Sequence, residues 1–296
     1  MSIVSVSMIK ELRGYSGAGM MDCKKALLAS KGDIEIAIDW LRKQGVQTAS
    51  KRSEKLTAEG LISILTNSEN TKGSLVEVNT ETDFVARNIK FQTYVNELTK
   101  FVLNSNNFQT QDLEKNIYPN TDRTFHEQLN YLISIIGENI FFKHQKSIQV
   151  KEGIVSNYIH NLITKNMGKI GVLVGIESKG DKEILNILGK KIAMHIAAKQ
   201  PIALERKDVK SSVINREREI YYSQAIDSGK PKNIIDKIVD GKLNKFFKES
   251  VLLEQSFVMD MNLTVKQFIK NIENDINKNI RISSFACLII NKKTNY

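Results

Sequence analysis

The sequence of 296 residues contains only two cysteines, Cys23 and Cys287, which lie far apart and form no CxxC pair. This spacing predicts neither a zinc site nor a disulfide framework. The four histidines are His126, His144, His160 and His195. No two of them are four residues apart, as two metal ligands on one helix face would be. We therefore expect reduced thiols and no metal site.

Long apolar runs are also missing from the sequence. No stretch approaches the roughly 18 to 20 uninterrupted apolar residues that would span a bilayer. The first five residues contain no basic segment followed by an apolar core, which a secretory signal would have. These two absences predict a soluble cytoplasmic protein.

Proline is scarce as well, with 3 residues, so we expect helices to dominate the chain. The fractions of hydrophobic residues, 41%, and charged residues, 26%, are ordinary for a globular protein. At about 150 residues per domain, the length predicts about two domains. The net charge of +10 would attract an acidic protein surface or a phosphate backbone, without choosing between them.

Apolar residues at three- and four-residue intervals predict a compact three-helix domain in residues 1–54. The expected helices are residues 6–13, 20–30 and 33–43. Gly32 suits the left-handed end of a helix, Asp33 suits the next N-cap, and Trp40 is the expected anchor of this small core. Residues 46–57 are rich in Lys, Arg, Ser and Thr and are predicted to be a charged linker.

A strand–loop–helix pattern that occurs twice in the remaining chain predicts an α+β fold. The first occurrence comprises a hairpin at residues 60–65 and 74–78, a helix from Asp83 and a helix at 125–136. The second comprises a segment from residue 146, a strand at 170–176, a helix at 185–199, a late helix at 263–276 and a final strand at 280–291. We therefore expect two related core subdomains, at residues 55–145 and at 146–207 together with 249–296.

Residues 208–248 predict a helical hairpin that projects from the body, because its helices are too polar to be buried on all sides. The hairpin breaks between Ser228 and Pro231, since glycine suits a helix end and proline an early helical position. Its apolar residues are Val213, Ile220 and Tyr221 on the first helix and Ile235, Ile238, Val239, Leu243 and Phe246 on the second. The alternative is a pair of helices that lie flat on the core.

An apolar strand ends, and a helix begins, in the run Asn79-Thr80-Glu81-Thr82-Asp83-Phe84-Val85. Thr82 or Asp83 can cap the first free N–H groups of this helix, and an acid is electrostatically favoured there. Apolar residues between Phe91 and Val102 then recur at helical spacing. Taken by itself, the run is most simply an N-cap followed by a core aromatic.

Motifs for catalysis or nucleotide binding are not found. A helix precedes Gly14, Gly17 and Gly19, and no Gly-Lys-Ser/Thr follows, so these glycines do not form a P-loop. The GxGxxG and GxSxG patterns are absent too. His195 lies in an apolar helix and is expected to find a hydrogen-bond partner in the core. Basic residues are scattered rather than interleaved with aromatics along a groove, as a nucleic-acid site would have them.

Several segments in a fixed order carry a family resemblance. They are Leu12-Arg13, Ser16 to Leu27, Thr82-Asp83-Phe84-Val85-Ala86, Ile136-Gly137-Glu138-Asn139-Ile140, Ile170 to Val174, Ile192 to His195, Gly229 to Lys232 and Phe257 to Met259. Together they resemble bacterial translation elongation factor Ts, the guanine-nucleotide exchange factor of elongation factor Tu, over nearly the whole chain. The resemblance implies a ubiquitin-associated-like (UBA-like) N-terminal domain, two α+β core subdomains and a coiled-coil hairpin.

The resemblance also implies a mechanism without enzymatic chemistry, cofactor or direct nucleotide binding. Such a factor binds the GDP-bound GTPase, displaces Mg²⁺ and GDP, and is released when GTP returns. No specific nucleic acid and no membrane is implied as a partner. The segment from Thr82 to Val85, in which Asp83 and Phe84 are central, would push into the GTPase near its Mg²⁺ and nucleotide site, where those contacts order the switch loops.

The resemblance implies further contacts with the GTPase. They are Arg13, Met20, Met21, Lys24, Arg52, Ile136, His160, Val258 and Met259. Methionines suit an adaptable apolar interface, although internal packing is the alternative, and we expect only one of Met20 and Met21 to be exposed. His160 would be an interface residue and not a base.

Two departures from the family pattern stand out. Residues 161–169 are expected to form a longer loop than the family's tight connection, and we expect the extra C-terminal helix of many members to be missing. Two other classes of protein remain as alternatives. One is a basic RNA- or ribosome-binding structural protein, and the other is a hydrolase whose site the sequence does not reveal.

Overall fold

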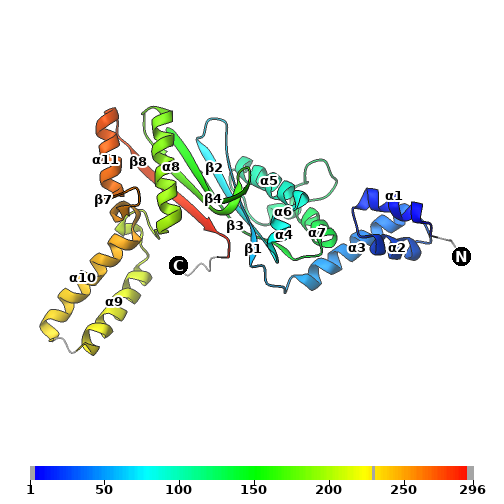
Figure 1. Cartoon of the computed structure of the whole chain (residues 1–296), viewed down its shortest axis with the longest axis horizontal. Coiled ribbons are helices and arrows are strands. Elements are labelled where there is room, and N and C mark those ends of the chain that lie inside the picture. Colours follow the sequence, from blue (N-terminus) through cyan, green and yellow to red (C-terminus); the bar gives the residue numbers. More distant parts are fainter. Residues whose placement is uncertain (1–3, 229–230, 292–296) are drawn as a thin grey trace. The chain divides into compact units, whose positions relative to one another are not determined.

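The computed structural model of the chain describes residues 4–228 and 231–291, which form two compact units (Figure 1). Unit 1 comprises residues 1–63, 76–145 and 163–169, and unit 2 comprises residues 64–75, 146–162 and 170–296. Both units contain helices and strands, which confirms the predicted α+β class. The finer division into five segments stays a prediction.

The helices are α1 (Val6–Ser16), α2 (Met20–Ala29), α3 (Ile34–Arg52), α4 (Asp83–Ala86), α5 (Ile89–Asn104), α6 (Asp112–Lys115), α7 (Phe125–Ile136), α8 (Lys182–Lys199), α9 (Ser211–Asp227), α10 (Lys232–Ser250) and α11 (Val265–Ile276). The strands are β1 (Glu59–Thr66), β2 (Lys72–Thr80), β3 (Ile140–Gln149), β4 (Gly153–Thr164), β5 (Met167–Glu177), β6 (Ser256–Phe257), β7 (Asp260–Thr264) and β8 (Arg281–Ile289). Two short 3-10 helices span Arg206–Asp208 and Leu252–Glu254. The larger sheet has the order β3-β2-β1-β5-β4, with β8 also paired to β5, and β6 pairs with β7.

Helices α1 to α3 of unit 1 enclose a small core in which Leu12, Cys23 and Leu27 are fully buried. Gly32 adopts the expected left-handed conformation, with φ 91°. Asp33 accepts a hydrogen bond from the backbone N–H of Ile36 at 2.9 Å, which confirms it as a cap. The prediction that Trp40 anchors this core is wrong. Trp40 is only half-buried and packs at the edge, because three smaller side chains fill the centre.

Helix α3 continues to Arg52, so the prediction of a charged linker at residues 46–57 is wrong for its first seven residues. The polar composition belongs to a solvated helix, since Lys, Arg, Gln and Ala are good helix formers. The helix packs along α7, where the buried Gly45 would place an added Cβ 3.2 Å from Cβ of Ser134. Only residues 53–58 connect α3 to β1.

The larger core of unit 1 confirms the predicted helix at residues 125–136 and the hairpin of β1 and β2. Phe91 and Tyr94 of α5 are fully buried, and the rings of Phe101 and Phe125 stack with centroids 4.8 Å apart. Helix α7 begins with a capping box formed by Thr124 and Glu127. Its end is set by Gly137 at φ 82°.

The prediction of a long loop at residues 161–169 is wrong. Strand β4 ends at Thr164 and strand β5 begins at Met167, so only Lys165 and Asn166 form the turn between them. Asn166 has φ 62°, a left-handed conformation that asparagine tolerates better than most residues. The connection after His160 is therefore tight.

In unit 2, β5 pairs antiparallel with β8, with Val172 opposite Cys287. Helix α8 buries Leu185, Leu188 and Ile192 against the strand residues Val172 and Val174, and α11 adds Ile269 to the same cluster. The predicted strand at residues 170–176 and helix at 185–199 are confirmed.

Helices α9 and α10 lie side by side as a helical hairpin (Figure 1). Ile235, Val239 and Leu243 of α10 are buried against Ala225 of α9, as the apolar stripe predicted. Ile220 does not join them, since 40% of it is exposed. Of the predicted break, Gly229 and Lys230 lie outside the described residues.

His195 is fully buried on α8 and has the core hydrogen-bond partner that was predicted. Its Nε2 lies 2.8 Å from Oε1 of Gln255, and its Nδ1 accepts the backbone N–H of Val258 at 3.3 Å. A neutral ring with the proton on Nε2 satisfies both bonds, whereas a second proton on Nδ1 would face the N–H of Val258. Burial lowers the pKa of His195 below its ordinary value of 6.5, so the folded protein favours the neutral ring.

This buried ring predicts that acid destabilises the protein. Below pH 6.5 the unfolded chain takes up a proton at His195 before the folded chain does, so stability is lost as the pH falls. Urea unfolding at pH 7.5 and 5.5 is expected to show this loss, with a slope of at most about 1.4 kcal/mol per pH unit from one group. The variant His195→Gln should be less stable than the wild type at pH 7.5, but its free energy of unfolding should depend less on pH. Equal slopes for both proteins would contradict the assignment.

Candidate functional site

The candidate site is the tip, residues Thr82–Val85, at the junction between β2 and α4 in unit 1. Phe84 is 80% exposed and Asp83 is exposed beside it, whereas Val85 is buried in the core of unit 1. The simpler alternative, in which Phe84 is a core aromatic, is therefore wrong. The buried Val85 anchors the turn in the core, and the turn presents Asp83 and Phe84 at the surface.

A helix begins at Asp83 with Thr82 in the N-cap position, as predicted, but the expected side-chain cap by Thr82 is absent and the helix is not continuous with the next one. Helix α4 ends after four residues, and Thr82 makes no side-chain capping bond to it. The long helix α5 has its own cap, Asn88, whose side chain accepts the backbone N–H of Lys90 at 2.9 Å. The break between the two helices lets the tip stand apart from α5.

The hydroxyl of Thr82 turns instead toward the segment between α7 and β3. Oε1 of Glu138 accepts the Thr82 hydroxyl at 2.7 Å, and Oε2 accepts the Thr82 backbone N–H at 2.9 Å. In return, Oε1 of Glu81 accepts the backbone N–H of Asn139 at 2.6 Å. We call these four residues, Glu81, Thr82, Glu138 and Asn139, the clasp. Each of its two segments holds the backbone of the other with a carboxylate.

The clasp is also tied to the end of the N-terminal helices. Arg52 at the end of α3 forms an ion pair with Glu81, with an Nη1 to Oε1 distance of 3.2 Å. The side-chain amide of Asn139 donates to the backbone oxygen of Lys55 at 2.9 Å. Arg52, which the sequence suggested as a partner contact, therefore has an intramolecular partner.

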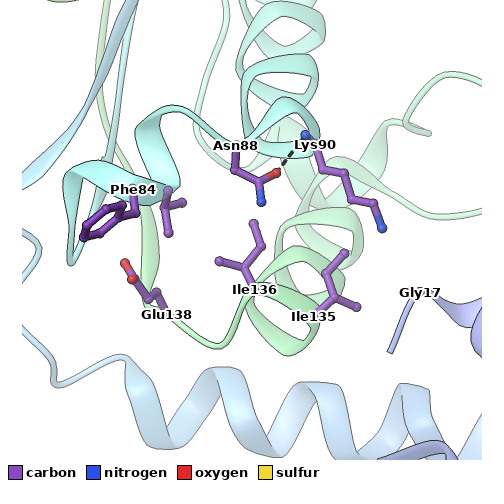
Figure 2. Close-up of a pocket in the computed structure, with 8 residues that line it drawn as sticks. Gly17, Phe84, Asn88, Lys90, Ile135, Ile136 and Glu138 are labelled. Carbon is purple, nitrogen blue, oxygen red and sulfur yellow. Dashed lines mark hydrogen bonds between the residues drawn. The ribbon is translucent and has the colours of Figure 1, made fainter. Parts of the chain in front are cut away.

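An open groove of about 380 Å³ runs beside the tip (Figure 2). It is lined by Gly17, Phe84, Val85, Asn88, Lys90, Ile135, Ile136 and Glu138. In Figure 2, Phe84 and Glu138 lie at one end, Gly17 lies at the other, and Ile135 and Ile136 lie between them. Ile136 is half-buried and lines the same groove as Phe84, so this candidate residue and the tip share one surface.

The candidates on the N-terminal helices are all on the surface. Arg13 and Lys24 are exposed. Met20 is 47% exposed and Met21 is 64% exposed, so the expectation that one of them is buried is wrong. Met20 is the first residue of α2, whose buried residues are Cys23, Ala26 and Leu27.

Three candidates belong to unit 2. His160 is exposed on β4, and its Nδ1 lies 3.0 Å from the hydroxyl of Tyr158. Val258 is half-buried and Met259 is exposed between β6 and β7. The candidates therefore belong to both units.

Sequence reasoning assigned no role to Glu81, Glu138 or Asn139, although Glu138 and Asn139 lie in a segment that carried the resemblance and Glu81 directly precedes another. The available signal was an acidic residue directly after Gly137, the glycine that ends α7. Glu138 binds Thr82, which lies 56 residues away in sequence, so the sequence alone could not pair these two residues.

Within residues 4–228 and 231–291, no group of three or more His, Cys, Asp or Glu side chains is arranged to hold a metal ion. The same residues include no helix with the length and apolar character that a membrane crossing requires.

Comparison with known proteins gives a consistent result. Residues 81–286 match the family model described as Elongation factor TS. The elongation factor Ts of Rhodospirillum centenum is 45% identical over 286 residues, which cover 97% of this chain and 92% of that protein. The elongation factor Ts of Bartonella quintana is 45% identical over 95% of this chain and 91% of its own length. That of Rhizobium etli is 44% identical over 98% and 93%. The chain belongs to the elongation factor Ts family.

Proposed function

We propose that this protein is a guanine-nucleotide exchange factor that binds the GDP-bound form of elongation factor Tu during polypeptide elongation. The tip displaces Mg²⁺ and GDP, and GTP then replaces them. The observation that carries this proposal is the 80% exposure of Phe84 beside the exposed Asp83 on an anchored turn. An aromatic ring in water at a rigid position is suited to insertion into a pocket on a partner.

Exchange by this route is thermodynamic linkage. If the tip binds where the Mg²⁺ and nucleotide contacts are made, factor and nucleotide each weaken the other's binding to the GTPase. A coupling of about 1.4 kcal/mol changes the nucleotide affinity tenfold. The factor therefore needs no nucleotide site, metal or cofactor of its own, and acts on the GTPase without catalysing a covalent reaction.

Other surfaces extend the proposed interface. In unit 1 these are Arg13, Met20, Met21, Lys24, Arg52 and Ile136, and in unit 2 they are His160, Val258 and Met259. Helices α1 to α3 would act as a UBA-like docking domain, and the hairpin of α9 and α10 as a coiled coil. The protein would work in the cytoplasm with elongation factor Tu, and not with a membrane or a specific nucleic acid.

Release of fluorescently labelled GDP from elongation factor Tu tests this function directly. Addition of the full-length protein is expected to accelerate release, and added Mg²⁺ should oppose the acceleration because it stabilises the state that the tip disrupts. Release at the unassisted rate would overturn the proposal. Strong, salt-sensitive binding to RNA without any effect on GDP release would instead favour the RNA-binding alternative.

A further inference from the structure

Outside the clasp, the tip backbone is held only by neighbouring residues among the hydrogen bonds described; for example, the hydroxyl of Thr80 donates to the backbone oxygen of Thr82 at 2.8 Å, and the N–H of Arg87 donates to that of Phe84 at 3.1 Å. Helix α4 has only four residues, and the Thr82 side chain does not cap it. Val85 and Ala86 are buried and fix the lower end of the turn, but Asp83 and Phe84 are exposed, so no core packing orients them. Thr82, directly before Asp83, is the point at which a segment distant in sequence holds the tip and can set its direction.

The clasp acts at that point. Both carboxylate oxygens of Glu138 are used on Thr82, one on the hydroxyl at 2.7 Å and one on the backbone N–H at 2.9 Å. Hydrogen bonds to a charged acceptor are shorter and stronger than neutral ones, and two of them fix both position and orientation. The bond of 2.6 Å from Asn139 N–H to Glu81 closes the arrangement from the other side.

We propose that Glu138, with Glu81 as its counterpart, is a positioning residue for nucleotide exchange, holding Asp83 and Phe84 in the orientation that enters the GTPase. This inference rests on the proposed function and assigns to Glu138 a role that acts through the tip. Without the clasp, the turn would have to be ordered at the moment of insertion, and that entropic cost would slow GDP release.

The ion pair between Arg52 and Glu81 gives the clasp a second support. It fixes the Glu81 carboxylate beside Asn139, and it links the end of α3 to the tip. Arg52 is partly exposed, so its contribution through a single ion pair is expected to be smaller than that of Glu138.

The decisive variant is Glu138→Gln, which keeps the shape of the side chain but replaces one acceptor oxygen with a donor. With labelled GDP on elongation factor Tu, the maximal release rate is expected to fall about tenfold, because both bonds lose their charged acceptor. The amide oxygen can still accept the Thr82 N–H, and the hydroxyl can turn to accept from the amide NH₂, so the two bonds become neutral and weaker. The concentration for half-maximal effect should change less than about twofold, since the other contact surfaces are intact. Thr82→Val, which removes only the hydroxyl, should give a smaller loss in the same direction.

A double-mutant cycle separates positioning from general damage. If Glu138 acts through Asp83 and Phe84, then Glu138→Gln in a background of Asp83→Ala with Phe84→Ala should cause almost no further loss. The matched control is Glu127→Gln, which alters a glutamate in the capping box at the start of α7, the helix that ends just before Glu138. That control should lose some stability but keep its maximal release rate.

Hydrogen exchange of the Thr82 amide gives a readout without the GTPase. Exchange is expected to be about tenfold faster in Glu138→Gln than in the wild type, and unchanged in Glu127→Gln. The inference is overturned if Glu138→Gln leaves either the amide exchange or the release rate unchanged, or if its effect adds fully to that of Asp83→Ala with Phe84→Ala. A wild-type protein that fails to accelerate GDP release would overturn the proposed function as well, so the two failures can be told apart.

Discussion

The double variant Asp83→Ala with Phe84→Ala is expected to accelerate GDP release from elongation factor Tu about 100-fold less than the wild type, which corresponds to about 2.7 kcal/mol. Burial of a phenylalanine side chain is worth about 1.5 to 3 kcal/mol, and the second substitution removes the exposed carboxylate beside it. Both side chains are exposed, so the variant should remain folded. Stopped-flow release of labelled GDP, with circular dichroism as a check of folding, measures the effect.

The matched control removes an acid and an apolar side chain elsewhere in unit 1. Ile117 is 56% exposed and Asp122 is exposed on the connection before α7, away from the clasp and the groove. Ile117→Ala with Asp122→Ala should release GDP at close to the wild-type rate. If Asp83→Ala with Phe84→Ala is folded and releases GDP as fast as this control does, the proposed mechanism is wrong.

The tip could be located from the sequence, but its geometry could not. The end of the strand near Thr80 and the helical spacing after Phe91 are local features, and both were predicted correctly. Whether Phe84 faces the core or the solvent depends on how the turn packs, and the core cluster that holds Val85 includes Ile133 of α7, about 50 residues away in sequence. The family resemblance, and not the residue pattern, favoured the exposed position.

The errors in the predicted fold have specific physical causes. A solvated helix and a charged linker share the same composition, so the last two turns of α3 were assigned to a linker. The turn at Lys165 and Asn166 contains no glycine or proline, and asparagine was the sole sign of a left-handed residue there. The clasp pairs residues more than 50 positions apart, a separation at which local patterns carry no information.

Gly60→Ala is expected to lower the free energy of unfolding by about 4 kcal/mol, because it combines overpacking with backbone strain. Gly60 has φ 141°, a conformation that other residues rarely adopt. An added Cβ would lie 2.3 Å from the backbone oxygen of Val78 and 2.7 Å from Cα of Asn79. Both are backbone atoms of β2, so neither can move aside as a flexible side chain could. Thermal and urea unfolding measure the loss.

The same substitution should also affect the tip, since β2 carries the chain from Val78 to Thr80 and then directly into the clasp. Gly14→Ala and Gly241→Ala are the matched controls, because both glycines lie in helices and an added Cβ would meet no atom within 4 Å. Each control should be neutral or stabilise the protein by up to about 1 kcal/mol. If Gly60→Ala unfolds like these two variants, then β1 and β2 do not approach as closely as described, and the rigid support beneath the tip must come from Val85 and the clasp alone.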